Sequence, residues 1–418
     1  MKKKDISFWI EEAYALYSSR PLVEKYYNKN YRIWVYTQKN MEDLVSKYFA
    51  DLNIEVILIE QKRNIYLKVL SKLFTMLFIN RNFSVMYSND LDQHNSFIYN
   101  FINKIFPFKI NKRNINNYYF NTMRIFNKFR FKGDFVIAFT FVHEPYLFAN
   151  SRTKVIFIME SWDHIVKRPH LIKPSYFMTW NEDLKLDAKI YQNYRHMNYI
   201  YPLKLRYIEK FSAMDYNNIL KYISNESYLK DLKRINNKDV ILYPVSYTSV
   251  DNYERHLDQL KFIKSLISVF SDSNFIFFIK PKPTGPIGDY DSLLGEKNVI
   301  IGEYTPSLNK EDMLKDEYHA YRYLLLKKSK LVINAGTTFG LDAALADTPV
   351  LQLNITEKYF GTYAKSTKNP HIEKYLLRSS LVSNFTGQEK IVMNETTISK
   401  GKKYSQELKS WCLNNPGI

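Results

Sequence analysis

Long apolar runs without polar interruptions constrain the fold of this chain more than any other feature. Five of them lie in the first half, at residues 31–37, 54–60, 134–141, 153–160 and 174–180. A strand with one solvated face alternates apolar and polar residues, whereas a parallel strand that is covered on both faces is apolar throughout. Helical patterns separate the runs, as at residues 41–50. The first half is therefore predicted to form a parallel sheet flanked by helices.

The second half of the chain repeats this alternation. Strands are predicted at residues 239–245, 274–281, 298–304, 331–333 and 350–353, and helices at 254–270 and 316–329. A chain of 418 residues also exceeds what one core usually supports. The sequence thus predicts an α/β protein with two doubly wound, Rossmann-like domains, at residues 1–205 and 206–395. A final helix, within residues 396–418, is expected to pack back on the first domain.

Export and membrane insertion are not expected. The most apolar segment, residues 69–79, is too short for a membrane span and contains a lysine. The N-terminal lysines are followed by Asp5, Glu11 and Glu12, where a signal peptide requires an apolar stretch. The single cysteine, Cys412, suits a reducing compartment. A cytoplasmic location is predicted.

The charge of the chain is strongly basic, with a net value of +18. Eight basic residues and no acidic one lie between Lys104 and Lys132, with aromatic residues between them. Three interpretations stay open for residues 104–132: a solvated helix face, a contact with anionic lipid, or a nucleic-acid surface. No recognised nucleic-acid module accompanies the segment, so a nucleic-acid partner is not expected.

Small and hydroxylated residues follow the predicted strand at residues 331–333. Gly336 permits a tight turn and a close ligand approach. Thr337 or Thr338 can cap the following helix or donate a hydroxyl to a phosphate, and the helix start suits an anion. Asp342 lies one turn further on the same face and is a candidate for a ribose or sugar hydroxyl. A capped helix without any ligand explains the same residues.

Two further strand ends carry cations and hydroxyls. Lys280 and Lys282 alternate with prolines after the strand at residues 274–281, which predicts a rigid, basic turn. Ser246 and Tyr247 follow the strand at residues 239–245. Because ligands of open parallel sheets bind at the carboxyl ends of the strands, these residues predict a site for a phosphorylated, nucleotide-like ligand.

Four segments in this order resemble bacterial GT-B glycosyltransferases of cell-surface polysaccharide synthesis: ESWDHIVKRPHLIKPSYFMTWNEDLKLDA, ILYPVSYTS, IKPKP and INAGTTFGLDAALADTPVLQL. The layout is similar to that of sialyl- and Kdo-transferases and of polyol-phosphate transferases. The resemblance covers residues 135–380 and implies a GT-B fold, in which two Rossmann-like domains face a cleft.

This chain departs from the family pattern at several positions. His164 replaces an asparagine, Lys280 and Lys282 stand where the family has arginine and histidine, and Asp342 stands for a glutamate. The second of the paired threonines, Thr338, replaces a serine. Lysine binds phosphate as a point charge and lacks the fork of arginine. The leaving group, a nucleoside monophosphate or diphosphate, is therefore left open.

The resemblance implies a reaction and roles for residues. The nucleotide-sugar donor is expected in the second domain and a glycan or lipid-linked acceptor in the first. Lys280, Lys282 and the turn at residues 336–338 are expected to offset the charge on the departing phosphate without a metal or other cofactor. The Asp-x-Asp spacing at residues 289–291 falls past the proline turn, where an exposed loop is expected. For the catalytic base, Asp163 is the first candidate, followed by Glu160 and His143.

Three alternatives remain at this point. A polyol-phosphate transferase would use the same site with a CDP-alcohol, and a sugar-nucleotide 2-epimerase shares the two-domain layout. A non-catalytic, basic lipid- or RNA-binding protein is the third, and residues 104–132 are its main support. For a transferase, the same segment predicts a peripheral contact with an anionic membrane surface on its cytoplasmic side.

Overall fold

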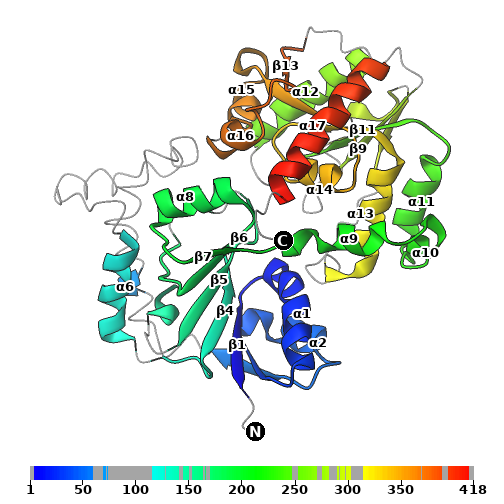
Figure 1. Ribbon diagram of the computed structural model, residues 1–418. Coiled ribbons are helices and arrows are strands. Elements are labelled where there is room, and N and C mark those ends of the chain that lie inside the picture. The colour runs from blue at the N-terminus through cyan, green and yellow to red at the C-terminus, as the bar shows by residue number, and fades with distance from the viewer. Residues whose placement is uncertain are drawn as a thin grey trace. The chain divides into compact units, whose positions relative to one another are not determined.

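The computed structural model divides into two compact units, residues 1–204 with 413–418, and residues 205–412 (Figure 1). It describes residues 4–59, 69–71, 73, 115–127, 129–140, 145–149, 153–162, 165, 170–246, 253–270, 275–281, 290, 292–296, 298–302, 314–368, 370–387 and 394–413. Asp163, His143, Tyr247 and Lys282, which the sequence singled out, lie outside these residues.

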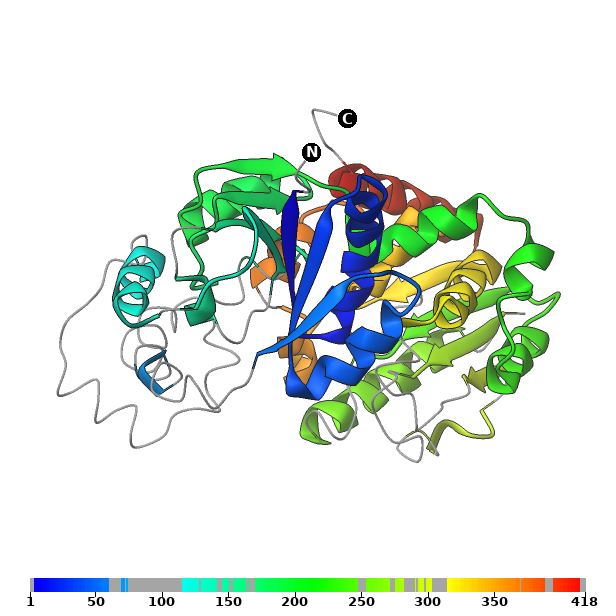
Figure 2. The same cartoon turned by 90° about the horizontal axis from the view of Figure 1, so that it is seen from below.

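The first unit contains a parallel sheet whose described strands have the order β3-β2-β1-β4-β5-β6-β7. The strands are β1 (Asp5–Ile10), β2 (Arg32–Gln38), β3 (Glu55–Ile59), β4 (Phe135–Phe139), β5 (Lys154–Ile158), β6 (Tyr176–Thr179) and β7 (Met197–Tyr199). The described α-helices are α1 (Ala13–Asn28), α2 (Glu42–Tyr48), α6 (Ile115–Phe126) and α8 (Glu182–Gln192). Figure 2 shows α1 and α2 beside the first strands, and the strand order reverses between β1 and β4.

The continuous apolar runs correctly predict β2 to β6, and these strands pair in parallel as expected. Strand β1 was missed, although it lies inside the sheet between β2 and β4. Its residues lie between N-terminal lysines and two glutamates. The apolar run is therefore short, and its charged flanks are typical of an exposed segment. In the structure Phe8 and Ile10 are fully buried.

The second unit has a parallel sheet with the order β10-β9-β8-β11-β12-β13. Its strands are β8 (Val240–Pro244), β9 (Ile276–Lys280), β10 (Val299–Ile301), β11 (Ser329–Asn334), β12 (Val350–Ile355) and β13 (Ser383–Phe385). Its described α-helices are α9 (Arg206–Ser212), α10 (Tyr216–Leu220), α11 (Glu226–Arg234), α12 (Tyr253–Phe270), α13 (Asp316–Lys328), α14 (Phe339–Leu345), α15 (Glu357–Ser366), α16 (Pro370–Tyr375) and α17 (Glu395–Leu413). Numbered along the chain, the strand order is 3-2-1-4-5-6, which is the Rossmann arrangement.

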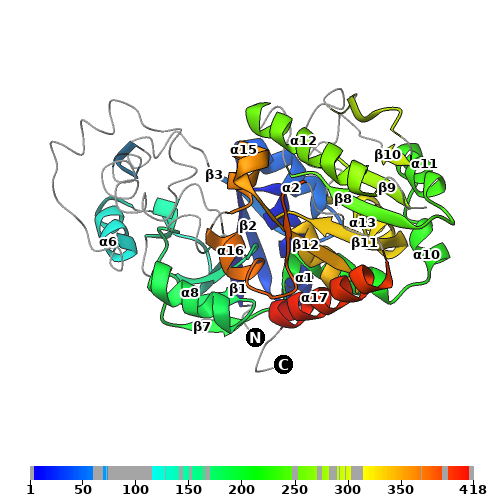
Figure 3. The ribbon, with the colours of Figure 1, turned by 90° about the horizontal axis from the view of Figure 1, so that it is seen from above.

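Helix α17 packs on the second unit (Figure 3). The Ser405 hydroxyl donates to the Thr348 carbonyl at 2.7 Å, and the Tyr404 hydroxyl donates to the Leu376 carbonyl at 2.8 Å. A Cβ at Gly401 would lie 2.9 Å from Leu331, so only a glycine lets the helix approach the sheet this closely. The packing of residues 396–418 on the first domain stays a prediction. None of the helices in the described part of the chain is both long and apolar enough to cross a membrane.

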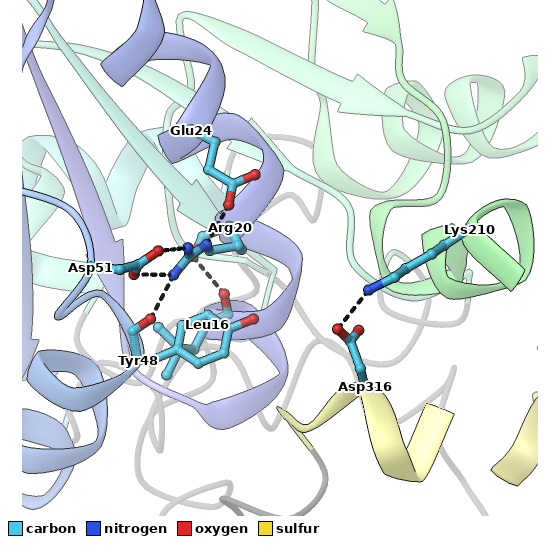
Figure 4. A network of polar contacts seen from close by, with 8 residues as sticks. Leu16, Arg20, Glu24, Tyr48, Asp51, Lys210 and Asp316 are labelled. Carbon is cyan, nitrogen blue, oxygen red and sulfur yellow. Dashed lines mark hydrogen bonds and ion pairs between the residues drawn. The ribbon is translucent and has the colours of Figure 1, made fainter. Parts of the chain in front are cut away.

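A polar network ties α1 to the segment that follows α2 (Figure 4). The Arg20 guanidinium donates to Asp51, to Glu24 at 2.6 Å and to the Tyr48 carbonyl at 2.7 Å. It also lies 5.7 Å from the centres of the Tyr48 and Phe49 rings. The hydrogen bond from Arg20 lowers the pKa of Asp51. The network fixes α1 and α2 relative to each other within the first unit.

We expect Asp51→Asn to lower the melting temperature of the first unit by about 2 °C at neutral pH, because the exposed pair loses its charge attraction. A carboxyl group with a lowered pKa stabilises the folded state above its unfolded pKa of about 3.9, and this contribution is lost as the pH falls through the folded value. The difference between wild type and variant should therefore disappear at acid pH. Thermal unfolding at neutral pH and at about pH 3 tests this, and a difference that persists in acid would contradict it.

Candidate functional site

The carboxyl edge of the second sheet brings three of the predicted strand ends together. Pro244 at the end of β8 pairs with Lys280 at the end of β9. Strand β11 is the other neighbour of β8, and it ends at Asn334. The strand order reverses between β8 and β11, and ligands of open α/β sheets bind at such a reversal.

The side chain of Asn334 builds the turn that follows β11. Its Oδ1 accepts hydrogen bonds from the Thr337 N–H at 3.1 Å and from the Thr337 hydroxyl at 2.7 Å. Its Nδ2 donates to Oε1 of Gln352 on β12 at 2.7 Å. Gly336 has a φ of 93°, which a glycine adopts without strain. The sequence identified the glycine correctly but did not identify Asn334 as the residue that holds the turn.

The two threonines of the turn have different surroundings. Thr337 already gives its N–H and its hydroxyl proton to Asn334. Thr338 is the N-cap of α14, and its side chain makes no capping hydrogen bond. Gly336, Thr337 and Thr338 are all partly exposed. Because α14 has only 7 residues, its dipole is a weak attraction for an anion, and the Thr338 hydroxyl is the better donor.

We expect Gly340→Ala to destabilise the second unit by about 3 kcal/mol. The added Cβ would lie 2.5 Å from Nδ2 of Asn334, so the asparagine would have to leave its hydrogen bonds. Gly295→Ala is a control, because open space surrounds that glycine and only its φ of +90° is unfavourable, at about 1 kcal/mol. Chemical denaturation of both variants tests the clash; equal losses would show that Asn334 can move without penalty.

Lys280 is a buried cation at this edge. Its exposed fraction is 9%, and its Nζ lies 5.7 Å from the centre of the Tyr318 ring. Burial lowers the pKa of this ammonium, with a smaller contribution in the same direction from Arg322. Among the described residues, no carboxylate lies within ion-pair distance of Nζ. Lys280 therefore carries a positive charge that the described part of the fold leaves uncompensated.

A second cation, Arg322 of α13, lies near Lys280, and the sequence analysis did not identify it. Its guanidinium carbon lies 5.5 Å from the centre of the Tyr318 ring, 5.3 Å from Tyr207 and 5.2 Å from Phe339. Its charge is paired with the carboxylate of Asp342, which is only 2% exposed. Asp342 thus holds Arg322 in place, and the predicted contact of Asp342 with a ligand hydroxyl stays a prediction.

The other buried acid near this cluster is already engaged. Asp231 of α11 accepts a hydrogen bond from the Tyr321 hydroxyl at 2.6 Å and lies 3.5 Å from Arg234. Asp231 and Asp342 both raise the pKa of Lys280 through space, but burial outweighs them. Neither buried carboxylate therefore forms an ion pair with Lys280 at the end of β9.

Ser246 lies at the end of the neighbouring strand. Its N–H donates to Oε1 of the buried Gln259 at 3.0 Å. Its own hydroxyl is buried and has no hydrogen-bond partner among the described residues. Ser246, Lys280 and Thr338 therefore present a hydroxyl, an ammonium and a hydroxyl along three adjacent strand ends.

In the first unit, Glu160 is the candidate base that the structure describes. It is 6% exposed, its Oε1 accepts from the Ser18 hydroxyl at 3.2 Å, and its N–H donates to the Thr140 hydroxyl at 2.9 Å. A second buried carboxylate, Glu11, follows β1 and accepts from Nε2 of Gln38 at 2.8 Å. The sequence analysis missed Glu11 as a site residue because it missed β1. Glu160 and Glu11 both follow strands close to the reversal between β1 and β4.

Helix α8 has a capped start in the first unit. Asn181 is the N-cap, and its side chain accepts from the Leu184 N–H at 3.0 Å. Among the described residues, no group of three or more His, Cys, Asp or Glu side chains is arranged to hold a metal ion.

Two parallel α/β units of Rossmann type in one chain define the GT-B fold, and this chain has that fold, as the sequence predicted. Among solved structures, MnaA of S. aureus in complex with UDP has a TM-score of 0.51 and 11% identity, over 99% of this chain and 93% of that chain. The UDP-GlcNAc 2-epimerase of Neisseria meningitidis bound to UDP-GlcNAc has a TM-score of 0.45 and 13% identity, over 98% and 100%. The calicheamicin glycosyltransferase CalG4 has a TM-score of 0.43 and 11% identity, over 99% and 95%.

At these identities the similarity concerns the fold alone. No protein-family model matches the chain, and no curated protein sequence matches it significantly.

Proposed function

We propose that this protein is a glycosyltransferase that binds a nucleotide-sugar donor at the carboxyl edge of its second sheet. The buried, uncompensated ammonium of Lys280 carries the proposal. A charge removed from water is unfavourable unless a counter-charge accompanies it. The phosphate oxygens of a donor would supply that counter-charge, at the strand ends where nucleotides bind in this type of sheet.

The other residues of this edge have complementary roles in the proposal. The hydroxyls of Ser246 and Thr338 would donate to phosphate oxygens. Arg322, held by Asp342 and three aromatic rings, would add positive potential near Lys280. Lys282, Tyr247 and the turn at residues 336–338 complete the predicted donor site. The complex of MnaA with UDP supports a nucleotide ligand for this fold.

The reaction follows from these charges. As the bond between the sugar carbon and the phosphate oxygen breaks, negative charge accumulates on the leaving phosphate, and fixed cations stabilise it more than they stabilise the intact donor. Lys280 and Lys282 would fill this role without a metal ion. A side chain of the first unit would accept the proton of the acceptor hydroxyl, and the candidates are Asp163, Glu160 and His143. We propose a glycan or lipid-linked acceptor of bacterial surface polysaccharide synthesis, on the resemblance described above.

A ligand panel followed by a product assay tests the function. Thermal shifts with CMP, CDP, UDP, GDP, dTDP and ADP identify the nucleotide, since a ligand at about a hundred times its dissociation constant stabilises the folded state by roughly 2.7 kcal/mol. The matching nucleotide sugars are then followed by proton NMR with and without acceptor glycans, in the presence of EDTA. A transferase releases nucleotide only when an acceptor is present, and EDTA should leave its rate unchanged.

Other outcomes of the same assay separate the alternatives. Conversion of the sugar to its epimer without an acceptor would identify a 2-epimerase and overturn the transferase. A response to CDP together with transfer from a CDP-alcohol would identify a polyol-phosphate transferase. If none of the nucleotides shifts the melting temperature, the proposed donor site is wrong. The basic residues 104–132 then become the main indication of function.

A further inference from the structure

The first unit exposes apolar side chains on two of its helices. Ile125 of α6 is 76% exposed, and Leu186 and Ile190 of α8 are 53% and 47% exposed. Leu186 and Ile190 are four residues apart and lie on the same face of α8. Tyr176, at the start of β6, is 40% exposed. Isolated exposed apolar residues are common, but a set on neighbouring elements marks an interaction surface.

Side-chain contacts connect these elements. The Lys173 ammonium lies 5.7 Å from the centre of the Phe120 ring on α6. The Tyr176 ring lies 6.4 Å from the His196 ring, which follows the end of α8. Figures 1 and 3 both show α6 and α8 at the side of the first unit where β6 and β7 lie. The exposed residues therefore belong to one side of this unit, called the α6–α8 surface here.

Basic residues surround the apolar ones on the α6–α8 surface. Its exposed cations are Arg124, Lys173, Lys189 and Arg195. Among the described residues, none of these four forms an ion pair, whereas Lys185 of helix α8 pairs with Glu182. Helix α6 itself contains no acidic residue. This combination of unpaired cations and exposed aliphatic chains is complementary to anionic lipid head groups and to the acyl region below them.

We propose that the α6–α8 surface docks the first unit on an anionic lipid bilayer. Ile125, Leu186 and Ile190 enter the boundary between head groups and acyl chains, and the four cations bind the lipid phosphates. Nucleic acid fits less well, since single strands are bound by stacking on aromatic rings, and three of the four exposed apolar residues are aliphatic. The inference adds α8 and the residues before β6 to the basic segment that the sequence singled out. It does not depend on the chemistry of the donor site.

Vesicle flotation of the full chain tests the proposal, with phosphatidylcholine alone or with about one third phosphatidylglycerol, at low and high salt. The wild type should bind the anionic vesicles at low salt. Lys189→Glu/Arg195→Glu should weaken this binding by at least about tenfold, and Leu186→Ser/Ile190→Ser should weaken it as well. Lys402→Glu/Lys403→Glu changes two exposed lysines of α17 by the same charge and should bind like the wild type.

Each contrary result overturns the proposal. Equal binding to neutral and anionic vesicles, no binding at all, or an equal loss in the α17 control would each do so. Binding of an RNA oligonucleotide that the Lys189→Glu/Arg195→Glu variant loses, without vesicle binding, would assign the surface to nucleic acid instead. The same variants should show the same nucleotide-induced thermal shift as the wild type. This measurement separates the membrane test from the donor site.

Discussion

Replacement of Lys280 by methionine is expected to weaken nucleotide binding strongly while it makes the folded protein more stable. Loss of a charge-assisted contact to phosphate should lower the affinity for the nucleotide by about a hundredfold. Removal of a buried charge that has no described counter-charge should raise the free energy of unfolding by about 1 kcal/mol or more. Titration calorimetry and chemical denaturation of the same preparation measure the two effects.

The stability gain should depend on pH in a defined direction. Burial lowers the pKa of Lys280 in the folded state, so the unfolded chain holds this proton more tightly. The charge therefore destabilises the fold at neutral pH, and the penalty disappears as the pH rises toward the unfolded value of about 10.4. The advantage of the methionine variant over the wild type should shrink over that window.

Lys330→Met is the matched control for Lys280→Met. Lys330 lies near the amino end of β11, is 56% exposed and is 3.4 Å from Asp239. We expect this variant to keep nucleotide affinity and to change stability little. If Lys280→Met retains full affinity, or if it destabilises the protein, the ammonium is a structural group and the proposed donor site is wrong.

Asp342→Asn is expected to have the largest effect on stability. The carboxylate is 2% exposed and pairs with Arg322, so its neutralisation removes this counter-charge from a largely buried guanidinium. Breaking a buried pair from one side costs roughly 3 kcal/mol. For a unit of this size, that lowers the melting temperature by about 9 °C. Scanning calorimetry should show the shift in the transition of the second unit alone.

Two variants define what this result means. Asp342→Asn/Arg322→Gln removes both charges and should recover part of the lost stability. Asp347→Asn removes the partner of Lys409 in an exposed pair, 2.6 Å long, and should cost well under about 1 kcal/mol. A stable Asp342→Asn protein that has lost nucleotide affinity would instead support the ligand contact that the sequence predicted.

The sheets of both units could be predicted because a strand that is covered on both faces appears in the sequence as a continuous apolar run. The runs that became β2, β5 and β8 are of this kind. Strand β1 could not be predicted, because only 6 residues separate its charged flanks. In the structure it lies between β2 and β4 and completes the Rossmann order. Edge strand β13, with 3 residues, is too short to give any pattern.

The candidate site could be predicted only in part. Lysine beside proline at a strand end showed that Lys280 lies at the carboxyl edge, but nothing in the sequence shows that its ammonium is buried. Arg322 could not be found, because one arginine in a helix usually belongs to a solvated face. Its pairing with Asp342 joins α13 to α14 across 20 positions of the chain, and periodicity reports only local spacing.

The division of the chain has a consequence for synthesis. Every described strand of the first sheet lies between residues 5 and 199, and every described strand of the second lies between residues 240 and 385. Neither sheet borrows a described strand from the other unit. During translation all strands of the first sheet can therefore pair before the second sheet has left the ribosome. No strand edge of the first sheet has to stay unpaired until later residues are synthesised.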